Sequence, residues 1–227
     1  MTKTEAASRN VNGAIAVRPR SITRHPLLNS IYQRHDELIA EFTTGRTLEV
    51  AFGRHPHPLA DVGVEAFPEN NQFVDSIDAV TADARSLPFT DNSFQTIIGR
   101  RFLHHVPVSG RQDILTEARR TLSDDGKLVL LEGTPGLYRR LTKEIAFKIG
   151  ALGDDNDEYG HLAADSMAKS VRQAGFEIVE LRSLGSPLMP FCILEGEWTR
   201  QLMGIYQRTQ FIRWWTFIVA KPTQPPE

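Results

Sequence analysis

The stretch from Thr81 to Val106 constrains the fold more than any other part of the sequence. It contains a β-branched apolar run at Thr96, Ile97 and Ile98, which lies between turn-forming residues and a basic, histidine-rich cluster. Such a run predicts a buried strand that delivers the side chains after it to a site. A second short apolar segment ends just before Asp83. We therefore expect a carboxylate at one strand end and imidazoles at the next to share one crevice.

Three sequence patterns occur in a fixed order around this stretch. L-E-V-A-F-G occupies residues 48–53, D-A-x-x-L-P-F-x-D-x-S-F begins at residue 83 and precedes the strand and L-H-H-V, and E-A-R-R-T-L-S-D-D-G-K-L-V-L occupies residues 117–130. Their order and spacing resemble those of class I S-adenosylmethionine-dependent methyltransferases of the small-molecule, type 11 family. The resemblance covers roughly residues 46 to 183. It implies S-adenosylmethionine as cofactor and a small-molecule methyl acceptor as partner.

The fold class follows from length and from this resemblance. A chain of 227 residues with 41% hydrophobic residues can bury one good core, which favours a single α/β domain. The resemblance implies a Rossmann-like, seven-stranded, mostly parallel sheet in the order 3-2-1-4-5-7-6, flanked by helices, with strand 7 antiparallel. Apolar residues at helical spacing also predict helices from Pro26 to about Phe42 and from about Ala164 to Ala174.

Composition excludes several classes of protein. A formal net charge of -2 gives no broad attraction to nucleic acid or to an anionic membrane. The single Cys192 excludes an internal disulfide, and no apolar run approaches the roughly 20 residues that span a bilayer. The first residues lack the apolar core of a signal peptide. These features predict a cytoplasmic protein without stable membrane insertion, and they leave its oligomeric state open.

The chain divides into one domain and three less regular segments. Residues 1–25 show no periodicity and are predicted to be a flexible tail, while residues 26–221 form the methyltransferase-like domain. Within it, residues 184–210 lose periodicity around Pro187 and Pro190, which is typical of a cap or insertion over the substrate. Residues 222–227 are predicted to be a C-terminal tail.

The turn after the first strand departs from the family pattern E/D-x-G-x-G-x-G. The acidic position is Glu49, and the three glycine positions are occupied by Ala51, Gly53 and His55. Small residues are needed there because backbone N–H groups must approach the ligand closely. The resemblance implies that Glu49, Ala51 and Gly53 bind the cofactor, whereas His55 places a side chain beside its amino-acid end.

The link to the second strand is too short for a helix. Gly53 and Glu65 are 12 positions apart, and Pro56 and Pro58 lie between them. We therefore predict a rigid loop over residues 54–61, which resembles a subgroup of the family with a Pro-His-Pro-x-Ala-Asp link. The Gly53 N–H is expected to lie near the cofactor.

Two strand-end acids match the acids of the family that bind adenosine. The second strand is predicted over Val62–Glu65, and the resemblance implies that Glu65 at its end accepts hydrogen bonds from both ribose hydroxyls. It also implies that Asp83 lies beside the adenine amino group and that Ala84 gives its N–H to the ring. The alternative for Glu65 is an exposed residue at a strand end without a ligand. The alternative for Asp83 is a residue that forms a turn before Arg85.

Residues after the central strand are expected at the methionine end of the cofactor. The resemblance assigns this place to Gly99 and Arg100, and the planar guanidinium could pair with the cofactor carboxylate. An acidic substrate is the alternative partner for Arg100 or Arg101.

Histidines supply the candidate bases. His104 and His105 are adjacent and are expected to point apart, one of them facing the cavity. The inward imidazole has a pKa range suited to deprotonating a methyl acceptor. His161, on a loop that often closes over the substrate in the family, is the second candidate. We favour His104 because a strand end holds a reacting group more rigidly than a loop does. No metal is expected, because the histidine spacing matches no known ligand set.

The function predicted from these patterns is methyl transfer from S-adenosylmethionine to a small molecule, at oxygen. The first alternative is a non-catalytic methyltransferase-like scaffold in which His55 and the prolines have closed the cofactor site. The second is an NAD(P)-dependent oxidoreductase, which is weakened by the lost G-x-G-x-x-G pattern and the lack of a clear Tyr-x-x-x-Lys pair.

Overall fold

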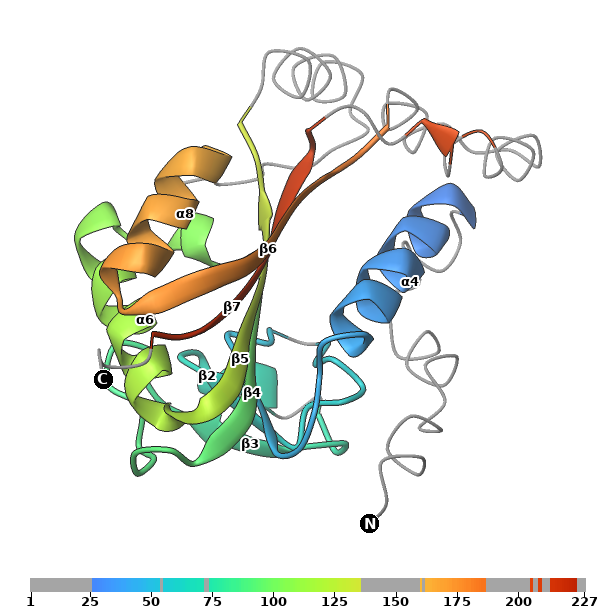
Figure 1. The fold of residues 1–227 in the computed structure, drawn as a ribbon. Coiled ribbons are helices and arrows are strands. Elements are labelled where there is room, and N and C mark those ends of the chain that lie inside the picture. The colour runs from blue at the N-terminus through green and yellow to red at the C-terminus, as the bar shows by residue number, and fades with distance from the viewer. Residues whose placement is uncertain are drawn as a thin grey trace.

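The computed structural model describes residues 26–53, 55–71, 74–135, 160, 162–186, 205, 208–209 and 213–223 (Figure 1). Within these residues, seven strands form one sheet in the order β3-β2-β1-β4-β5-β7-β6. The strands are β1 (Thr47–Val50), β2 (Val62–Glu65), β3 (Asp78–Thr81), β4 (Phe94–Arg100), β5 (Leu122–Gly133), β6 (Phe176–Leu184) and β7 (Trp215–Pro222). Strand β7 is antiparallel to β5 and β6, and the other pairs are parallel. The predicted fold class and strand order are confirmed.

Helices cover both faces of this sheet (Figure 1). The described helices are α4 (Pro26–Ala40), the short α5 (Pro68–Asn71), the 3-10 turn η1 (Leu103–His105), α6 (Val108–Thr121) and α8 (Ala164–Gln173). Helices α6 and α8 lie on one face and α4 on the other. None of these helices is long and apolar enough to cross a membrane.

The alternation of side chains along the central strands builds two cores. In β4, Ile97 belongs to the core under α6 and α8, whereas Ile98 belongs to the core under α4. The same alternation places Leu128 in the first core and Val129 in the second. Successive side chains of a strand point to opposite faces, and both faces are covered, so the middle of β4 and of β5 carries apolar residues on both faces.

Two local expectations can be compared with these elements. The link between β1 and β2 forms turns over residues 55–61 and no helix, as its prolines predict. Its end is fixed because the Asp61 N–H donates to the Thr47 carbonyl at 2.9 Å. The sequence D-D-G at residues 124–126, which is typical of a turn, does not separate α6 from its strand. It lies inside β5, where the register with β4 shifts between the pairs Phe94–Leu122 and Thr96–Lys127.

Some predictions fall outside the described residues. The tail at residues 1–25, His161, and most of the proposed cap at residues 184–210 belong to this group. The tail, the cap and the second candidate base therefore stay predictions.

Candidate cofactor and acceptor site

The carboxyl ends of β1 and β4 form the point where the strand order reverses. Val50 of β1 pairs with Gly99 of β4, while the chain leaves the two strands toward opposite edges of the sheet. Such a switch point opens a crevice that binds ligands in α/β folds. Each strand is followed by a residue with left-handed backbone: Ala51 has φ 54° and Arg101 has φ 53°. Non-glycine residues in this region are strained, and such strain concentrates at functional sites.

The glycine position and the ribose acid lie together at this crevice. Gly53 has φ 62°, and a Cβ added there would meet nothing within 4 Å. Its N–H donates to Glu65 Oε2 at 2.8 Å, and the Phe67 N–H donates to Glu65 Oε1 at 3.2 Å. Because an ionised carboxylate has about four acceptor positions, these bonds leave capacity for ribose hydroxyls. The side chain of Glu65 is thus buried and fixed beside open space at Gly53.

Arg100 is bound to carboxylates of the chain itself. Its Nε donates to Glu49 Oε1 at 2.6 Å, and its Nη1 lies 3.3 Å from Asp36 Oδ1. Its Nη2 also donates to the His55 carbonyl at 2.8 Å. Burial lowers the pKa of Arg100, but the charges of Glu49 and Asp36 outweigh this effect and raise the pKa overall. The predicted pairing with a cofactor carboxylate would have to compete with these contacts.

His57 fastens the proline-containing link to this cluster. Its backbone N–H donates to Glu49 Oε2, and its buried ring accepts from the Leu59 N–H on Nδ1 at 3.2 Å. Nδ1 is therefore an acceptor, so Nε2 carries the proton and faces the Asp36 carbonyl at 3.3 Å. Among the described residues, no group of three or more His, Cys, Asp or Glu could hold a metal ion.

His104 is held by Glu132 at the carboxyl end of β5. The Nδ1 atom of His104 lies 3.0 Å from Glu132 Oε2. The other carboxylate oxygen, Oε1, accepts the N–H groups of Phe102 at 2.8 Å and Leu103 at 2.9 Å. Glu132 is 1% exposed and His104 is 7% exposed, so water competes weakly for these bonds. The structure therefore presents an imidazole with a fixed carboxylate partner.

The expectation that His104 and His105 point apart was wrong. Their ring centroids are 4.0 Å apart with an interplanar angle of 45°. Both residues lie in the 3-10 turn η1, where three residues complete a turn and neighbouring side chains are about 120° apart, in contrast to the opposite faces of a strand. The expected difference in environment is present, because His104 is buried and His105 is exposed.

An aromatic series borders the crevice on the α4 side. The guanidinium carbon of Arg101 lies 4.3 Å from the ring centre of Tyr32. The Tyr32 ring meets His35 edge-on at 6.2 Å, and His35 meets Trp215 edge-on at 4.6 Å. Trp215 pairs with Gly133 of β5, the residue after Glu132. Helix α4 therefore borders the carboxyl ends of the central strands.

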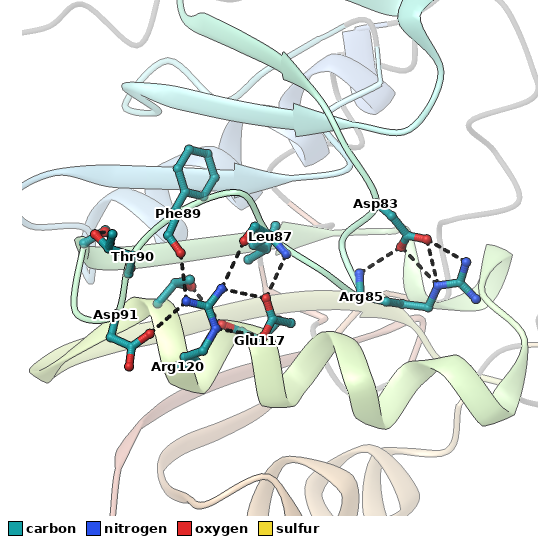
Figure 2. A network of polar contacts seen from close by, with 10 residues as sticks. Asp83, Arg85, Leu87, Phe89, Thr90, Asp91, Glu117 and Arg120 are labelled. Atoms are coloured by element: carbon teal, nitrogen blue, oxygen red, sulfur yellow. Dashed lines mark hydrogen bonds and ion pairs between the residues drawn. The ribbon is translucent and has the colours of Figure 1, made fainter.

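Asp83 forms a turn with Arg85, which is the alternative to adenine binding named in the sequence analysis. Its carboxylate accepts the Arg85 N–H at 2.8 Å and lies 2.6 Å from Arg85 Nη2 (Figure 2). The hydrogen bond from the Arg85 side chain, followed by that from its backbone, lowers the pKa of Asp83. Both side chains are about half exposed. These contacts explain the Asp83 side chain through local structure, and its role toward adenine, with that of Ala84, stays a prediction.

The L-P-F loop is clamped by two residues of α6 that belong to the third sequence pattern but received no role in the sequence analysis. Arg120 donates to the Leu87 carbonyl at 3.0 Å and to the Phe89 carbonyl at 2.8 Å (Figure 2). It also pairs with Glu117 at 2.7 Å and Asp91 at 2.8 Å. Glu117 in turn accepts the Leu87 N–H at 2.8 Å. The spacing of Glu117 and Arg120 on one helix face was the available signal.

Gly99 has a packing reason to be glycine. A Cβ there would lie 2.7 Å from the Phe102 ring and 2.8 Å from Leu130, so any side chain would displace the start of η1. Gly99 therefore sets the position of the turn that carries His104.

Comparison with known proteins identifies this arrangement. Residues 57–130 match the methyltransferase-domain family. The ubiquinone/menaquinone biosynthesis C-methyltransferase UbiE of Roseobacter denitrificans is 31% identical over 140 residues, which cover 55% of this chain and 54% of that protein. This chain spans about half the length of the curated relatives it matches. Over the part of the fold that contains β2 to β5, the chain is thus similar to methyltransferases.

Solved structures share the fold of this chain. The [4+2]-cyclase SpnF has a TM-score of 0.62 and 18% identity, with 98% of this chain and 96% of that chain covered. Geranyl diphosphate C-methyltransferase from Streptomyces coelicolor, solved with S-adenosyl-L-homocysteine, has a TM-score of 0.61 and 13% identity, with 93% and 86% covered. At this identity the likeness establishes the fold alone.

The residues present fit the ribose end of S-adenosylmethionine, the cofactor of this class. Gly53 leaves open space at the switch point, and the Glu65 carboxylate is fixed beside it. Ala51 keeps the left-handed backbone of the glycine that it replaces. The methionine end would meet the cluster of Arg100 and Glu49, whose charges are already paired.

Proposed function

We propose that this chain binds S-adenosylmethionine and transfers its methyl group to a small molecule. The observation that carries the proposal is the contact between Gly53 and Glu65 beside open space at the switch point. The acid that would bind ribose and the backbone that would approach the cofactor lie together there. The family match over residues 57–130 supports the same reading.

The side chains of the chain are expected to align the acceptor and remove its proton. S-adenosylmethionine supplies an activated methyl group when bound, so alignment and a base are what remain for the protein. We propose His104 as that base, because it is held rigidly at the end of β5 by Glu132. His161 stays the alternative, at a position outside the described residues.

We propose an acceptor with an ionisable hydroxyl next to the carbon that is methylated. Oxygen was the atom expected from the sequence, whereas the curated relatives that match are named C-methyltransferases. A base assists methylation at either atom. Removing the hydroxyl proton of a phenol or enol leaves negative charge that is shared between the oxygen and the neighbouring carbon. The product distinguishes them: a carbon-methylated product keeps its titratable hydroxyl, and an oxygen-methylated product loses it.

Calorimetric titration with S-adenosylmethionine tests the binding step. Replacing Glu65 with glutamine should weaken binding about 10- to 100-fold, because a charged acceptor of ribose hydrogen bonds is lost. Glu177→Gln is the matched control, since that glutamate is exposed and pairs with Lys221 on β7, away from the switch point. Circular dichroism would establish that both variants are folded.

A non-catalytic scaffold is the second candidate. The observation in its favour is the cluster of Arg100, Glu49 and Asp36, which satisfies the charges at the methionine end internally. If millimolar S-adenosylmethionine and its demethylated product give neither heat nor a thermal shift, the scaffold replaces the enzyme as the conclusion. The oxidoreductase alternative receives no support from the matched family.

A further inference from the structure

We propose that Glu132 is a positioning residue that places the proton of neutral His104 on Nδ1 and so makes Nε2 the base. This inference rests on the proposed function for the base's role, but the position of the proton can be measured without any substrate. It starts from the three donors that converge on one carboxylate: the Phe102 N–H, the Leu103 N–H and the His104 ring.

Three groups surround the carboxylate of Glu132. Two backbone N–H groups and an imidazole approach its oxygens at 2.8 to 3.0 Å, and a carboxylate can accept such hydrogen bonds on both oxygens. Arg111 supplies a compensating positive charge nearby. Burial lowers the pKa of the Arg111 guanidinium, and the charge of Glu132 opposes that shift.

An ionised carboxylate fixes the tautomer of its imidazole partner. A carboxylate oxygen only accepts hydrogen bonds, so the Nδ1 atom of His104, 3.0 Å away, must donate. The neutral ring then carries its proton on Nδ1 and its lone pair on Nε2. The same carboxylate holds the backbone of η1 through Phe102 and Leu103, so it fixes ring position and proton position together.

The proton balance of the reaction follows from this tautomer. The hydroxyl proton of the acceptor moves to Nε2. For methylation at oxygen, the electron pair that it leaves forms the new bond to the methyl carbon. For methylation at the neighbouring carbon, that pair becomes a carbon–oxygen π bond, the displaced π pair forms the bond to the methyl carbon, and the proton of the methylated carbon then moves to the oxygen and restores the hydroxyl. The electron pair of the broken carbon–sulfur bond remains on sulfur, which becomes a neutral thioether. The imidazolium that forms is stabilised by Glu132, while the exposed His105 ring at 4.0 Å and the charge of Arg111 also face this region. The histidine later returns the proton to water.

Glutamine at position 132 should reverse the tautomer. Its amide oxygen can still accept the two backbone N–H groups, which directs the amide NH₂ toward His104 Nδ1. Nδ1 must then accept, so the proton moves to Nε2 and the base is lost. Glu132→Gln thus changes the chemistry of His104 with little change in the shape of the side chain.

Long-range proton–nitrogen NMR spectra of histidine-labelled protein test this directly. Wild-type His104 should show the Nδ1–H tautomer, and Glu132→Gln should show the Nε2–H tautomer, with His104→Gln assigning the signal. His57 is an internal control: its contacts with Leu59 and Asp36 predict Nε2–H in both proteins. An Nε2–H tautomer for wild-type His104 would overturn the proposal, and that spectrum needs no variant to fold.

Kinetics supply the second measurement. Glu132→Gln should lower kcat for methyl transfer by about 10²- to 10⁴-fold and leave the dissociation constant for S-adenosylmethionine within about twofold. Unchanged kcat in a variant with the reversed tautomer would overturn the role as base. Failure of the wild-type protein to bind S-adenosylmethionine would instead overturn the proposed function and with it that role, whatever the tautomer.

Discussion

Two clusters in this domain have the same composition and different surroundings. Each contains one arginine and two carboxylates; the residues are Arg100, Glu49 and Asp36 in one, and Arg120, Glu117 and Asp91 in the other. The arginine side chain is 10% exposed in the first cluster and 32% exposed in the second. The first joins α4, β1, β4 and the proline-containing link, whereas the second joins α6 to the L-P-F loop (Figure 2).

Burial decides what each cluster can tolerate. Water can solvate a carboxylate that loses its partner at the surface, so exposed ion pairs contribute little. Water cannot solvate a buried charge that loses its partner, so the desolvation cost of that charge remains in the folded state. The shared composition of the two clusters therefore does not imply equal contributions to stability.

The largest effect is expected for Arg100→Met. Removing this guanidinium leaves Glu49 and Asp36 buried without their shared cation, so the free energy of unfolding should fall by about 3–5 kcal/mol. Arg120→Met, the matched substitution in the exposed cluster, should cost only about 1–2 kcal/mol because water reaches the freed groups. Urea unfolding of both variants measures the difference. Equal losses would show that burial does not separate the two clusters.

The parts of the fold that follow local rules could be predicted from sequence. Strand β2 has the predicted bounds, and the absence of a helix after Gly53 follows from two prolines in a short link. The alternation that sends Ile97 and Ile98 to opposite cores is likewise a property of neighbouring residues. Periodicity and turn chemistry carry this information because they act over a few positions.

The partners within the site could not be predicted in the same way. Arg100 contacts Asp36, which lies 64 positions earlier, and His104 contacts Glu132, which lies 28 positions later. Such pairs depend on how a helix and a strand end are placed in three dimensions, which no local pattern records. The sequence therefore predicted that the site lies at the carboxyl ends of the central strands, but it did not predict which charged residues form ion pairs there.

Acid should remove the contribution of the exposed cluster. Hydrogen bonding from the Arg120 side chain lowers the pKa of Glu117 below its ordinary value of 4.5. A carboxyl with a lowered pKa stabilises the fold fully above its unfolded-state pKa, and that stabilisation disappears as pH falls through the folded-state pKa. At neutral pH, Glu117→Gln should cost about 1–2 kcal/mol of unfolding free energy. The gap between wild type and variant should then narrow below about pH 4.5. A gap that stays constant down to pH 3 would mean that the charge of Glu117 does not support the clamp.

The smallest effect on stability is expected at Asp83, because its partner Arg85 is more exposed than Arg120, the other arginine of Figure 2. Asparagine can still accept the Arg85 N–H that closes the turn, so Asp83→Asn should leave the thermal midpoint within about 2 °C of wild type.

The same variant also separates the two roles of Asp83, the turn and the contact with adenine. Asparagine cannot accept from the adenine amino group on both side-chain atoms as a carboxylate can. Because Arg85 already holds the carboxylate in the turn, we expect the dissociation constant for S-adenosylmethionine to change less than about threefold. A tenfold loss of affinity in a variant with an unchanged midpoint would instead assign Asp83 to the adenine, and the contact with Arg85 would then be what orients that acid.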